Sequence, residues 1–296
     1  MIDWDDMRIF LSVARLESLS GAARELRLDP ATVGRRIARL ERGMNAVLFL
    51  KSPQGYVATD VGERLIRHAE AAERAVAGVA EEVSGGREGL RGTIRLGAPD
   101  GCATYLLPAV TKRLVAANPG LDIQIVALPR VFNLSKREAD MAIGVSRPTA
   151  GRLRIQKITD YKLLLAAAKG YLKSNSQILE PRDLRRHSIV GYIPDMIFDT
   201  ELDYLAELGV SHVNFASNSV PVQIAWLRAS AGVGVVHDFA LVDAPDLEVV
   251  LKERFALTRT FWLIRHADDA RVIRLNRFAE ALTAEMRHEI AVRSQA

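Results

Sequence analysis

The 296-residue sequence has one cysteine, Cys102, and no long apolar run. A single cysteine excludes a disulfide within the chain and favours a reducing compartment. The most apolar short stretch, Leu163 to Ala168, is far too short to span a bilayer. The first ten residues are acidic and lack the basic flank and apolar run of a signal peptide. These absences predict a cytoplasmic protein that does not enter a membrane.

Sequence motifs of catalysis are also missing. There is no G-x-S-x-G, no P-loop and no G-x-G-x-x-G, and the six histidines show no metal-ligand spacing. Cys102 has no partner base in the pattern, so we interpret it as a buried or pocket-lining thiol. His237 and Asp238 are neighbours on a predicted strand, where adjacent side chains point apart. We therefore expect no enzyme activity, no metal and no cofactor.

The net charge is only +4, which is weak evidence for a nucleic-acid partner. The distribution of charge says more. Between Arg15 and Lys51 there are eight basic residues against four acidic ones. A locally basic segment can attract a polyanion even when the whole chain is only slightly basic.

This basic segment has the pattern of a helix-turn-helix. Apolar spacing predicts a helix over Trp4 to Leu16, and Ser18 or Ser20 can cap a second helix whose Ala22 and Ala23 face inward. The small alanines would let another helix cross closely. A short turn then leads to a third helix, which is the order of elements in DNA-reading domains.

The third helix has a well-marked start and two distinct faces. Asp29 is a good N-cap and Pro30 suits the first helical position, while Val33, Ile37 and Leu40 form the buried face. The opposite face carries small residues and then arginines: Ala31, Thr32, Arg35, Arg39 and Arg42, with Arg36 on the flank. Charge alone is equally compatible with a solvated arginine face. The order of helices, the cap and a predicted hairpin wing around "KSPQ" together favour DNA.

A long helix follows, with Asp60 and Glu63 as a capping-box-like start. Six apolar residues are spaced 4, 3, 4, 3 and 4 apart, which is typical of a coiled-coil seam: Leu65, Ala69, Ala72, Val76, Val79 and Val83. The alternative is a helix packed on its own domain. The regular seam and the glycine-rich stretch after it favour pairing with a second chain, which would present two recognition helices to DNA.

From about Thr93 the pattern alternates between strands and helices, which predicts an α/β fold with largely parallel sheets. Ligands of such sheets bind at the carboxyl ends of strands. The candidates there are Pro99, Asp100, Gly101, Cys102, Thr104, Arg130, Phe132, Ser146, Ser217, Asn218, Ser219 and His237. Asp100 would oppose a carboxylate, which favours a neutral or amine-bearing ligand. The three polar residues from Ser217 to Ser219 can equally be helix caps.

The chain resembles the LysR-type transcriptional regulators over essentially its full length. The densest match runs from Ser18 to Leu65, and the family's landmarks there are filled by Ala22, Ala23, Val33, Arg35, Leu40, Glu41, Leu48, Phe49, Thr59 and Gly62. Further matches are "GTIRLGAP", "LLPAV", "NPGLDIQIV", "READMAIGV" and "SNSVPVQIAWLRASAGVGVV". Departures include Gly34 for the usual serine, Lys51 for the wing arginine, and His237 with Asp238 for leucine-proline.

The resemblance implies a winged helix-turn-helix, a long linker helix and a two-lobed α/β effector-binding domain similar to type 2 periplasmic binding proteins. The expected domains are 1–59, 60–90 and 91–296, with lobe 1 at about 91–160 and 267–296 and lobe 2 at about 161–266. The chain would cross between lobes near 159–161 and 265–267 and bind its effector in the cleft. The family usually works as a tetramer, a dimer of dimers, on promoter DNA.

The resulting hypothesis is a DNA-binding regulator controlled by a small molecule of unknown identity. Thr32 and Arg35 are the candidates for base contacts because they lie outward near the helix start. Arg36, Arg39 and Lys51 are expected to hold phosphates. The alternative is a small-molecule-binding or enzymatic α/β domain that carries an accessory DNA-binding module.

Overall fold

The structure is a computed structural model, and it describes residues 3–52, 55–83, 89–127, 139–149, 151–197, 199–205, 208–210 and 212–294. The chain divides into two compact units, Met1–Glu88 and Gly89–Ala296. Each unit has its own main cluster of buried apolar side chains, as is typical of parts that fold around separate cores. No helix among the described residues is both long enough and apolar enough to cross a membrane.

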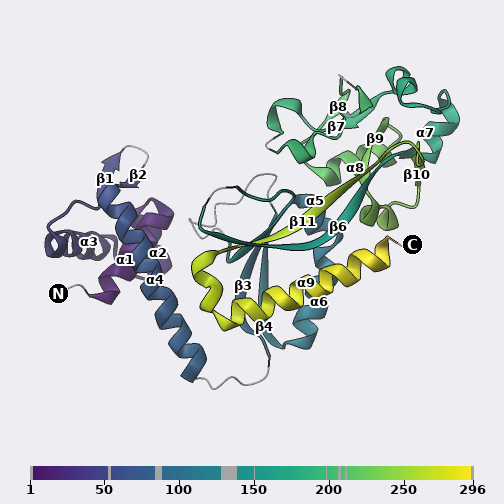
Figure 1. The fold of residues 1–296 in the computed structure, drawn as a ribbon. Helices are drawn as coiled ribbons and strands as arrows, with labels where there is room; N and C mark the ends of the chain where they lie inside the picture. Colours follow the sequence, from purple (N-terminus) through teal and green to yellow (C-terminus); the bar gives the residue numbers. More distant parts are fainter. Residues whose placement is uncertain are drawn as a thin grey trace. The chain divides into compact units, whose positions relative to one another are not determined.

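The first unit contains three short helices, a hairpin and one longer helix (Figure 1). In chain order the elements are α1 (Trp4–Leu16), α2 (Leu19–Leu26), α3 (Pro30–Met44), β1 (Phe49–Ser52), β2 (Gly55–Ala58) and α4 (Asp60–Val83). The three predicted helices and the predicted hairpin are confirmed. Ser18 is the residue that caps α2, because its Oγ accepts a hydrogen bond from the Gly21 N–H at 3.1 Å.

The core of this unit forms where α1, α2 and α3 cross. Ala22 and Ala23 are fully buried, so their small side chains let the helices approach closely. Phe10 of α1 packs against Phe49 of β1, with ring centroids 5.0 Å apart. The apolar positions predicted for α1 and α3 thus meet in one cluster, which leaves the opposite face of α3 to solvent.

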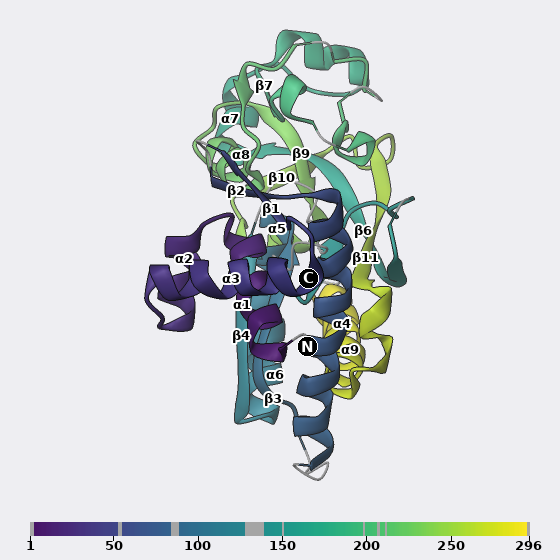
Figure 2. The same ribbon diagram turned by 90° about the vertical axis from the view of Figure 1, so that its left-hand side faces the viewer.

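The long helix α4 extends well beyond the other helices of its unit (Figure 2). Its cap is Thr59, not Asp60 as the capping-box pattern predicted. The Thr59 Oγ1 accepts a hydrogen bond from the Gly62 N–H at 3.0 Å and donates one to the Val47 carbonyl at 2.8 Å. The same side chain therefore starts α4 and ties it to the segment that leads into the hairpin.

The second unit is built on one continuous nine-stranded sheet. Its strands are β3 (Arg91–Ala98), β4 (Gly120–Ala127), β5 (Met141–Gly144), β6 (Leu153–Ala168), β7 (Ile189–Gly191), β8 (Phe215–Ala216), β9 (Val233–His237), β10 (Leu247–Val250) and β11 (Ala256–His266). Its helices are α5 (Asp100–Tyr105), α6 (Leu107–Ala117), α7 (Lys169–Ser174), α8 (Val220–Arg228) and α9 (Ile273–Arg293), with short 3₁₀ segments between them. The predicted α/β alternation is confirmed.

The sheet is mixed rather than largely parallel, which corrects the sequence-based expectation. Its order is β4-β3-β5-β11-β6-β9-β7-β8, with β10 paired to β6. The end strands pair in parallel, but the long strands β6 and β11 are antiparallel to each other and to their other neighbours. These two strands carry the chain between the lobes, and two segments that cross in opposite directions must pair antiparallel.

The two long strands also place the crossings between lobes. Figure 1 shows β6 and β11 running through the whole second unit, with β3 and β4 at one end and β7 to β9 at the other. The register of β11 shifts between Phe261 and Trp262, and from Trp262 onward the strand pairs with β5 of the first lobe. The return crossing therefore falls earlier in the chain than the expected residues 265–267.

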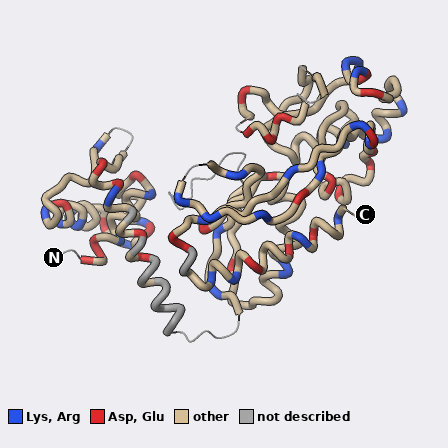
Figure 3. The backbone as a smooth tube through the Cα atoms, viewed as in Figure 1, with Lys and Arg blue, Asp and Glu red and all other residues tan. Residues whose placement is uncertain are grey.

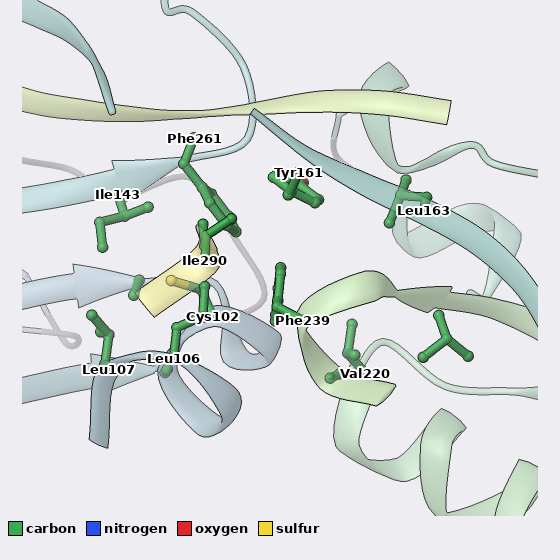
Figure 4. Close-up of a cluster of buried hydrophobic side chains, with 14 of the residues drawn as sticks. Cys102, Leu106, Leu107, Ile143, Tyr161, Leu163, Val220, Phe239, Phe261 and Ile290 are labelled. Atoms are coloured by element: carbon green, nitrogen blue, oxygen red, sulfur yellow. The ribbon is translucent and has the colours of Figure 1, made fainter. Parts of the chain in front are cut away.

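Helices cover the sheet of the second unit and close its core. The amphipathic helix α6 lies beside α9, and Arg113 of α6 donates from Nη1 to the Glu289 carboxylate of α9 at 2.8 Å. Figure 4 shows the core beneath the sheet, where Tyr161, Phe239 and Phe261 gather around the point at which the chain crosses between lobes. These three aromatic side chains belong to the main buried cluster of the second unit.

Candidate functional site

The recognition helix α3 is set up by its own sequence. The Asp29 carboxylate accepts a hydrogen bond from the Ala31 N–H at 2.8 Å, and Pro30 occupies the first helical position. Val33, Ile37 and Leu40 are at most 5% exposed, so the buried face predicted from spacing is confirmed. The other face must then point outward.

The two candidate base readers lie together on that outward face. Arg35 is exposed, and its Nη2 donates to the Thr32 Oγ1 at 3.0 Å. Ala31 is exposed one turn earlier, where its small side chain leaves room for close approach. Neither Arg35 nor Arg42 forms an ion pair with any residue the structure describes. Their guanidinium groups thus remain available to an anionic partner.

Arg36 and Arg39 behave differently, because they reach across to the start of α1. Arg39 binds Asp6 in a two-pronged arrangement, with Nε 2.6 Å from Oδ2 and Nη2 2.5 Å from Oδ1. Arg36 Nη1 donates to the same Asp6 Oδ1 at 2.8 Å, and its Nη2 lies 3.1 Å from Asp5 Oδ2. Arg39 Nη2 also bonds Asp3 Oδ2 at 3.1 Å. A DNA phosphate would therefore have to compete with these carboxylates for Arg36 and Arg39, which the sequence pattern did not reveal.

Asp6 differs from its two acidic neighbours in being buried. Its side chain is 3% exposed, against 51% for Asp3 and 40% for Asp5. Burial by itself would raise the pKa of the Asp6 carboxyl, but the hydrogen bonds and charges of Arg39 and Arg36 outweigh it and lower that pKa. In turn, the hydrogen bond to Asp6 raises the pKa of Arg39. Asp6 is thus a charged carboxylate held between two arginines.

The hairpin wing is fixed firmly beside α1 and α3. The Tyr56 N–H donates to the Glu17 carbonyl at 2.9 Å, and a Cβ on Gly55 would lie 2.3 Å from that same oxygen. Gly55 also has a φ of +133°, which favours glycine. Lys51 pairs with Tyr56 across the hairpin and is exposed, as predicted for a phosphate contact. The residues at the wing tip lie outside the described ranges.

The predicted seam of α4 is divided between two roles. Leu65 is 6% exposed and Ala69 is fully buried, and both belong to the core of the first unit itself. Their burial is what the alternative of a helix packed on its own domain predicts for this half of the seam. The cause is that α4 passes directly over the helix bundle, where Arg15 of α1 forms an ion pair with Glu73 at 2.8 Å.

One turn beyond Glu73, α4 has an exposed apolar residue, Val76. Ala72 is half-buried and Val76 is 54% exposed. The side chains of Val79 and Val83 lie outside the described part of the structure. Of the predicted seam, the described side chains that the first unit does not bury are those of Ala72 and Val76.

In the second unit, Asp100 brings two of the predicted ligand segments together. One carboxylate oxygen accepts from the Gly101 N–H at 2.8 Å at the start of α5, and the other accepts from the Val220 N–H at 3.0 Å at the start of α8. Burial raises the pKa of Asp100, while hydrogen bonds from Ser219 and from these two N–H groups act to lower it. Pro99 is half-buried at the same junction.

The polar residues before α8 form hydrogen bonds mainly within the turn that leads into this helix. The Ser217 Oγ accepts from the Ser219 N–H at 3.1 Å, and the Ser217 carbonyl accepts from the Gln223 side chain at 2.7 Å. Ser219 makes no side-chain cap to α8, and Asn218 is half-buried. Ser146 reaches the other lobe, where it hydrogen-bonds Asp199. The predicted segments around residues 100, 146 and 217–219 therefore all lie where the lobes meet.

Two predicted ligand residues are core residues instead. Cys102 is 1% exposed and lies among apolar side chains such as Leu106 (Figure 4), and burial raises the pKa of its thiol. His237 is 6% exposed and stacks on Tyr161 with ring centroids 5.5 Å apart. Burial lowers the pKa of His237 to about 4, so its ring is neutral. His237 is covered by the aromatic packing at the crossing strands, which no local pattern shows, whereas the burial of Cys102 agrees with one of the two interpretations of its thiol made from the sequence.

The remaining candidates do not converge on one point. Thr104 is exposed. Arg130 and Phe132 lie outside the described residues. Among the described residues, no three histidine, cysteine, aspartate or glutamate side chains cluster in a way that could hold a metal ion.

A cavity of about 400 Å³ lies in the second lobe, between β7, β9, α8 and the chain from Tyr192 to Val213. Its described lining is mostly aliphatic, with Tyr192, Asp203, Tyr204 and Gln223 as polar residues and no Lys, Arg or His. Burial raises the pKa of both tyrosines, so they are neutral phenols. No sequence motif marks these residues: Gln223 lies on α8, and the others follow strand β7 in a stretch without long regular elements, where only the tyrosines stand out.

Comparisons with known proteins place the chain in one family. The model of the bacterial regulatory helix-turn-helix protein, lysR family, matches residues 4–63, and the model of the LysR substrate binding domain matches residues 87–287. The chain belongs to the LysR family of transcriptional regulators. It is therefore a DNA-binding regulator with a substrate-binding domain, as the resemblance in the sequence predicted.

Individual relatives agree with this assignment. The chain is 24% identical to the Mau operon transcriptional activator of Paracoccus denitrificans, over 96% of this chain and 98% of that protein. It is 32% identical to the HTH-type transcriptional regulator DgdR of Burkholderia cepacia, over 84% and 82%. A full-length OxyR variant from Pseudomonas aeruginosa shares the fold with a TM-score of 0.75 at 18% identity, over 97% and 95%. Full-length LysG from Corynebacterium glutamicum, with bound effector arginine, gives 0.64 at 15%, over 97% and 99%.

Proposed function

We propose that this regulator reads promoter DNA through Thr32 and Arg35 of the recognition helix. The observation that carries the proposal is the pairing of these two side chains on the outward face of α3, clear of every described carboxylate. An arginine that meets a guanine edge contributes about 1–3 kcal/mol of discrimination between bases. Ala31 lets the helix approach the groove, and Lys51 of the wing holds a phosphate.

The test is a binding titration of the full chain on DNA from upstream of its own gene, against a scrambled fragment. Arg35→Ala is expected to lower the preference for the native fragment about 5- to 150-fold. Arg42→Ala is the matched control, because Arg42 lies on the same outward face two turns further along the helix. Equal loss of preference in both variants, or none in Arg35→Ala, would contradict the assignment.

We also propose that a neutral or amine-bearing small molecule controls the regulator from the second unit. Two features support this choice. The Asp100 carboxylate already accepts a hydrogen bond from the Val220 N–H at the start of α8, where an acidic ligand would otherwise be favoured. The cavity beside β7 offers two neutral phenols, an amide and the Asp203 carboxylate, but no described cation. A carboxylic acid would find repulsion there rather than a partner.

A thermal-shift screen of the full chain tests this proposal, with neutral, amine-bearing and carboxylate metabolites in separate sets. A ligand that binds the folded state raises its melting temperature by mass action. Val213→Phe narrows the cavity and is expected to abolish the shift, while Val222→Phe makes the same change at an exposed site of α8 outside the lining. A strong shift by carboxylates alone, unaffected by Val213→Phe, would refute both the ligand class and the site.

We further infer that the working unit is a homodimer that associates as a tetramer and acts in the cytoplasm by binding rather than by catalysis. Family membership supports assembly and a promoter target, and the exposed Val76 supports pairing through the far half of α4. Sedimentation velocity of the full chain, with and without operator DNA, measures the assembly directly.

A further inference from the structure

We propose that Asp6 is a specificity-determining residue, because it holds Arg36 and Arg39 against α1 and withdraws their charge from the DNA backbone. The inference rests on the proposed DNA interface of α3 and goes beyond it. Two of the four arginines of the recognition helix are paired with carboxylates, while Arg35 and Arg42 make no ion pair with described residues. The helix thus presents two kinds of arginine to DNA.

The geometry at Asp6 distinguishes it from an ordinary surface ion pair. Its two oxygens accept three charge-assisted hydrogen bonds, at 2.8, 2.5 and 2.6 Å, from two guanidinium groups. The arrangement with Arg39 uses Nε and Nη2 together, which fixes the plane of the guanidinium as well as its position. The side chains of Arg36 and Arg39 are themselves 31% and 51% exposed, so they are accessible from solvent while they are held.

The number and geometry of the hydrogen bonds at Asp6 make the pairing hard for a phosphate to replace. Exposed ion pairs exchange partners at little cost, and Asp3 and Asp5 belong to that kind. A phosphate that drew both arginines away from Asp6 would have to replace three charge-assisted hydrogen bonds, two of them in the fixed arrangement with Arg39 Nε and Nη2. The arginines are therefore expected to stay on Asp6 when DNA binds.

The consequence concerns the balance between sequence-independent and sequence-dependent binding. Each phosphate neutralised by a protein cation releases counterions and adds about 0.9 to the slope of log affinity against log salt. Two arginines retained by Asp6 contribute little to that term, so a larger share of the affinity comes from Thr32 and Arg35. Figure 3 shows acidic as well as basic residues along the backbone of the first unit.

The experiment compares salt dependence in the full chain for the wild type, Asp6→Asn and Glu253→Gln, on native and scrambled DNA. Asp6→Asn is nearly isosteric and leaves both arginines with only the exposed carboxylates of Asp3 and Asp5, which a phosphate can replace at little cost. We expect the slope to steepen by about 0.9 for each released arginine, which is a further 3- to 12-fold loss of affinity between 50 and 200 mM salt. Binding to scrambled DNA at low salt should strengthen, so the preference for the native fragment falls. Glu253→Gln changes the net charge equally in the second unit and should alter neither quantity.

A second pair of variants separates charge from folding. Arg39→Gln in the wild type should change the slope of log affinity against log salt by much less than about 0.9, because Asp6 already neutralises Arg39. The same substitution added to Asp6→Asn should make the steeper slope shallower again by about 0.9. If Asp6 had a purely structural role, Asp6→Asn would lower the stability measured by thermal unfolding, but Arg39→Gln would change the salt slope equally with and without Asp6→Asn. Where Asp6→Asn fails to fold, Arg39→Gln alone decides the question.

The outcomes distinguish this inference from the proposed function. A full loss of about 0.9 in slope for Arg39→Gln in the wild type, or an unchanged slope in folded Asp6→Asn, overturns the role of Asp6 while DNA binding stands. A wild-type protein that binds neither fragment removes the proposed interface and this inference with it.

Discussion

Two residues of the same predicted seam, Leu65 and Val76, should respond to truncation in opposite ways. They lie eleven residues apart on α4 and so face nearly the same direction. Leu65 is 6% exposed and sits in the core of its own unit, while Val76 is 54% exposed. Leu65→Ala is therefore expected to destabilise the first unit, and Val76→Ala to weaken association between chains.

The magnitudes follow from burial. Truncating a buried leucine to alanine costs about 2–5 kcal/mol, from lost transfer energy and the cavity left behind. Val76→Ala removes two carbons that are about half exposed in the single chain, so burying them in a partner yields about 0.8 kcal/mol per subunit. For two subunits the loss is about 1.6 kcal/mol, or about a 15-fold weaker dimer. The effect of Val76→Ala on the stability of the first unit should stay within about 0.5 kcal/mol.

Hydrogen exchange and sedimentation measure the two effects separately in the full chain. Exchange rates of α1 and α3 amides report the opening free energy of the first unit, independently of the second unit. Sedimentation equilibrium over a range of concentrations gives the dimer constant. If Leu65→Ala leaves protection of α1 and α3 intact but dissociates the dimer, then Leu65 faces a partner and the division of the seam is wrong.

Three further predictions concern glycine, histidine and cysteine positions. Gly34→Ala should stabilise the first unit by about 0.5–1 kcal/mol, because the added Cβ would meet only a Leu19 methyl at 3.8 Å. Gly62→Ala should destabilise the same unit by about 1–3 kcal/mol, because the added Cβ would lie 2.3 Å from a backbone oxygen. The pKa of His237 is about 4 in the folded protein and about 6.5 when unfolded, so stability of the second unit should fall by about 3 kcal/mol as pH drops from 6.5 to 4, and His237→Phe should remove that dependence. Cys102 should resist thiol reagents in the native protein, because burial raises the pKa of its thiol.

Denaturant titrations monitored by exchange, repeated over pH, check the first two of these predictions. Equal effects of alanine at Gly34 and Gly62 would show that the contact at Gly62 is not rigid. An acid transition that persists unchanged in His237→Phe would assign it to carboxylates instead. Rapid labelling of Cys102 without unfolding would mean that the core around it opens in the native state.

The first unit could be predicted almost element by element because its signals are local. The cap at Asp29, the proline after it and the 3.6-residue spacing all act within a few residues, and each appears in the structure as expected. The start of α4 was misplaced by one residue because Thr59 and Asp60 are both good caps, and only the tie from Thr59 to Val47 decides between them.

The second unit shows where local reasoning ends. Alternation of strands and helices predicted the α/β class, but strand direction depends on which segments cross between lobes. His237 ends a strand, as a ligand residue would, and only the packing of Tyr161 and Phe239 against it shows that it is buried. The cavity is bounded by a stretch with little regular structure, so periodicity gave no signal for it.

The charge of the DNA-facing helix is the case in which counting along the sequence misleads most. Eight basic residues against four acidic ones between Arg15 and Lys51 give a surplus of four, and adding residues 3–14 cuts that surplus to two. The fold decides where those added acids act, because it carries the start of α1 to the side of α3 and buries Asp6 against two arginines. Net charge then overstates the pull of the helix on phosphates, while Arg35 makes no ion pair with a described residue at the point where we propose that bases are read. A regulator built this way gains selectivity from the cations it restrains as well as from those it presents.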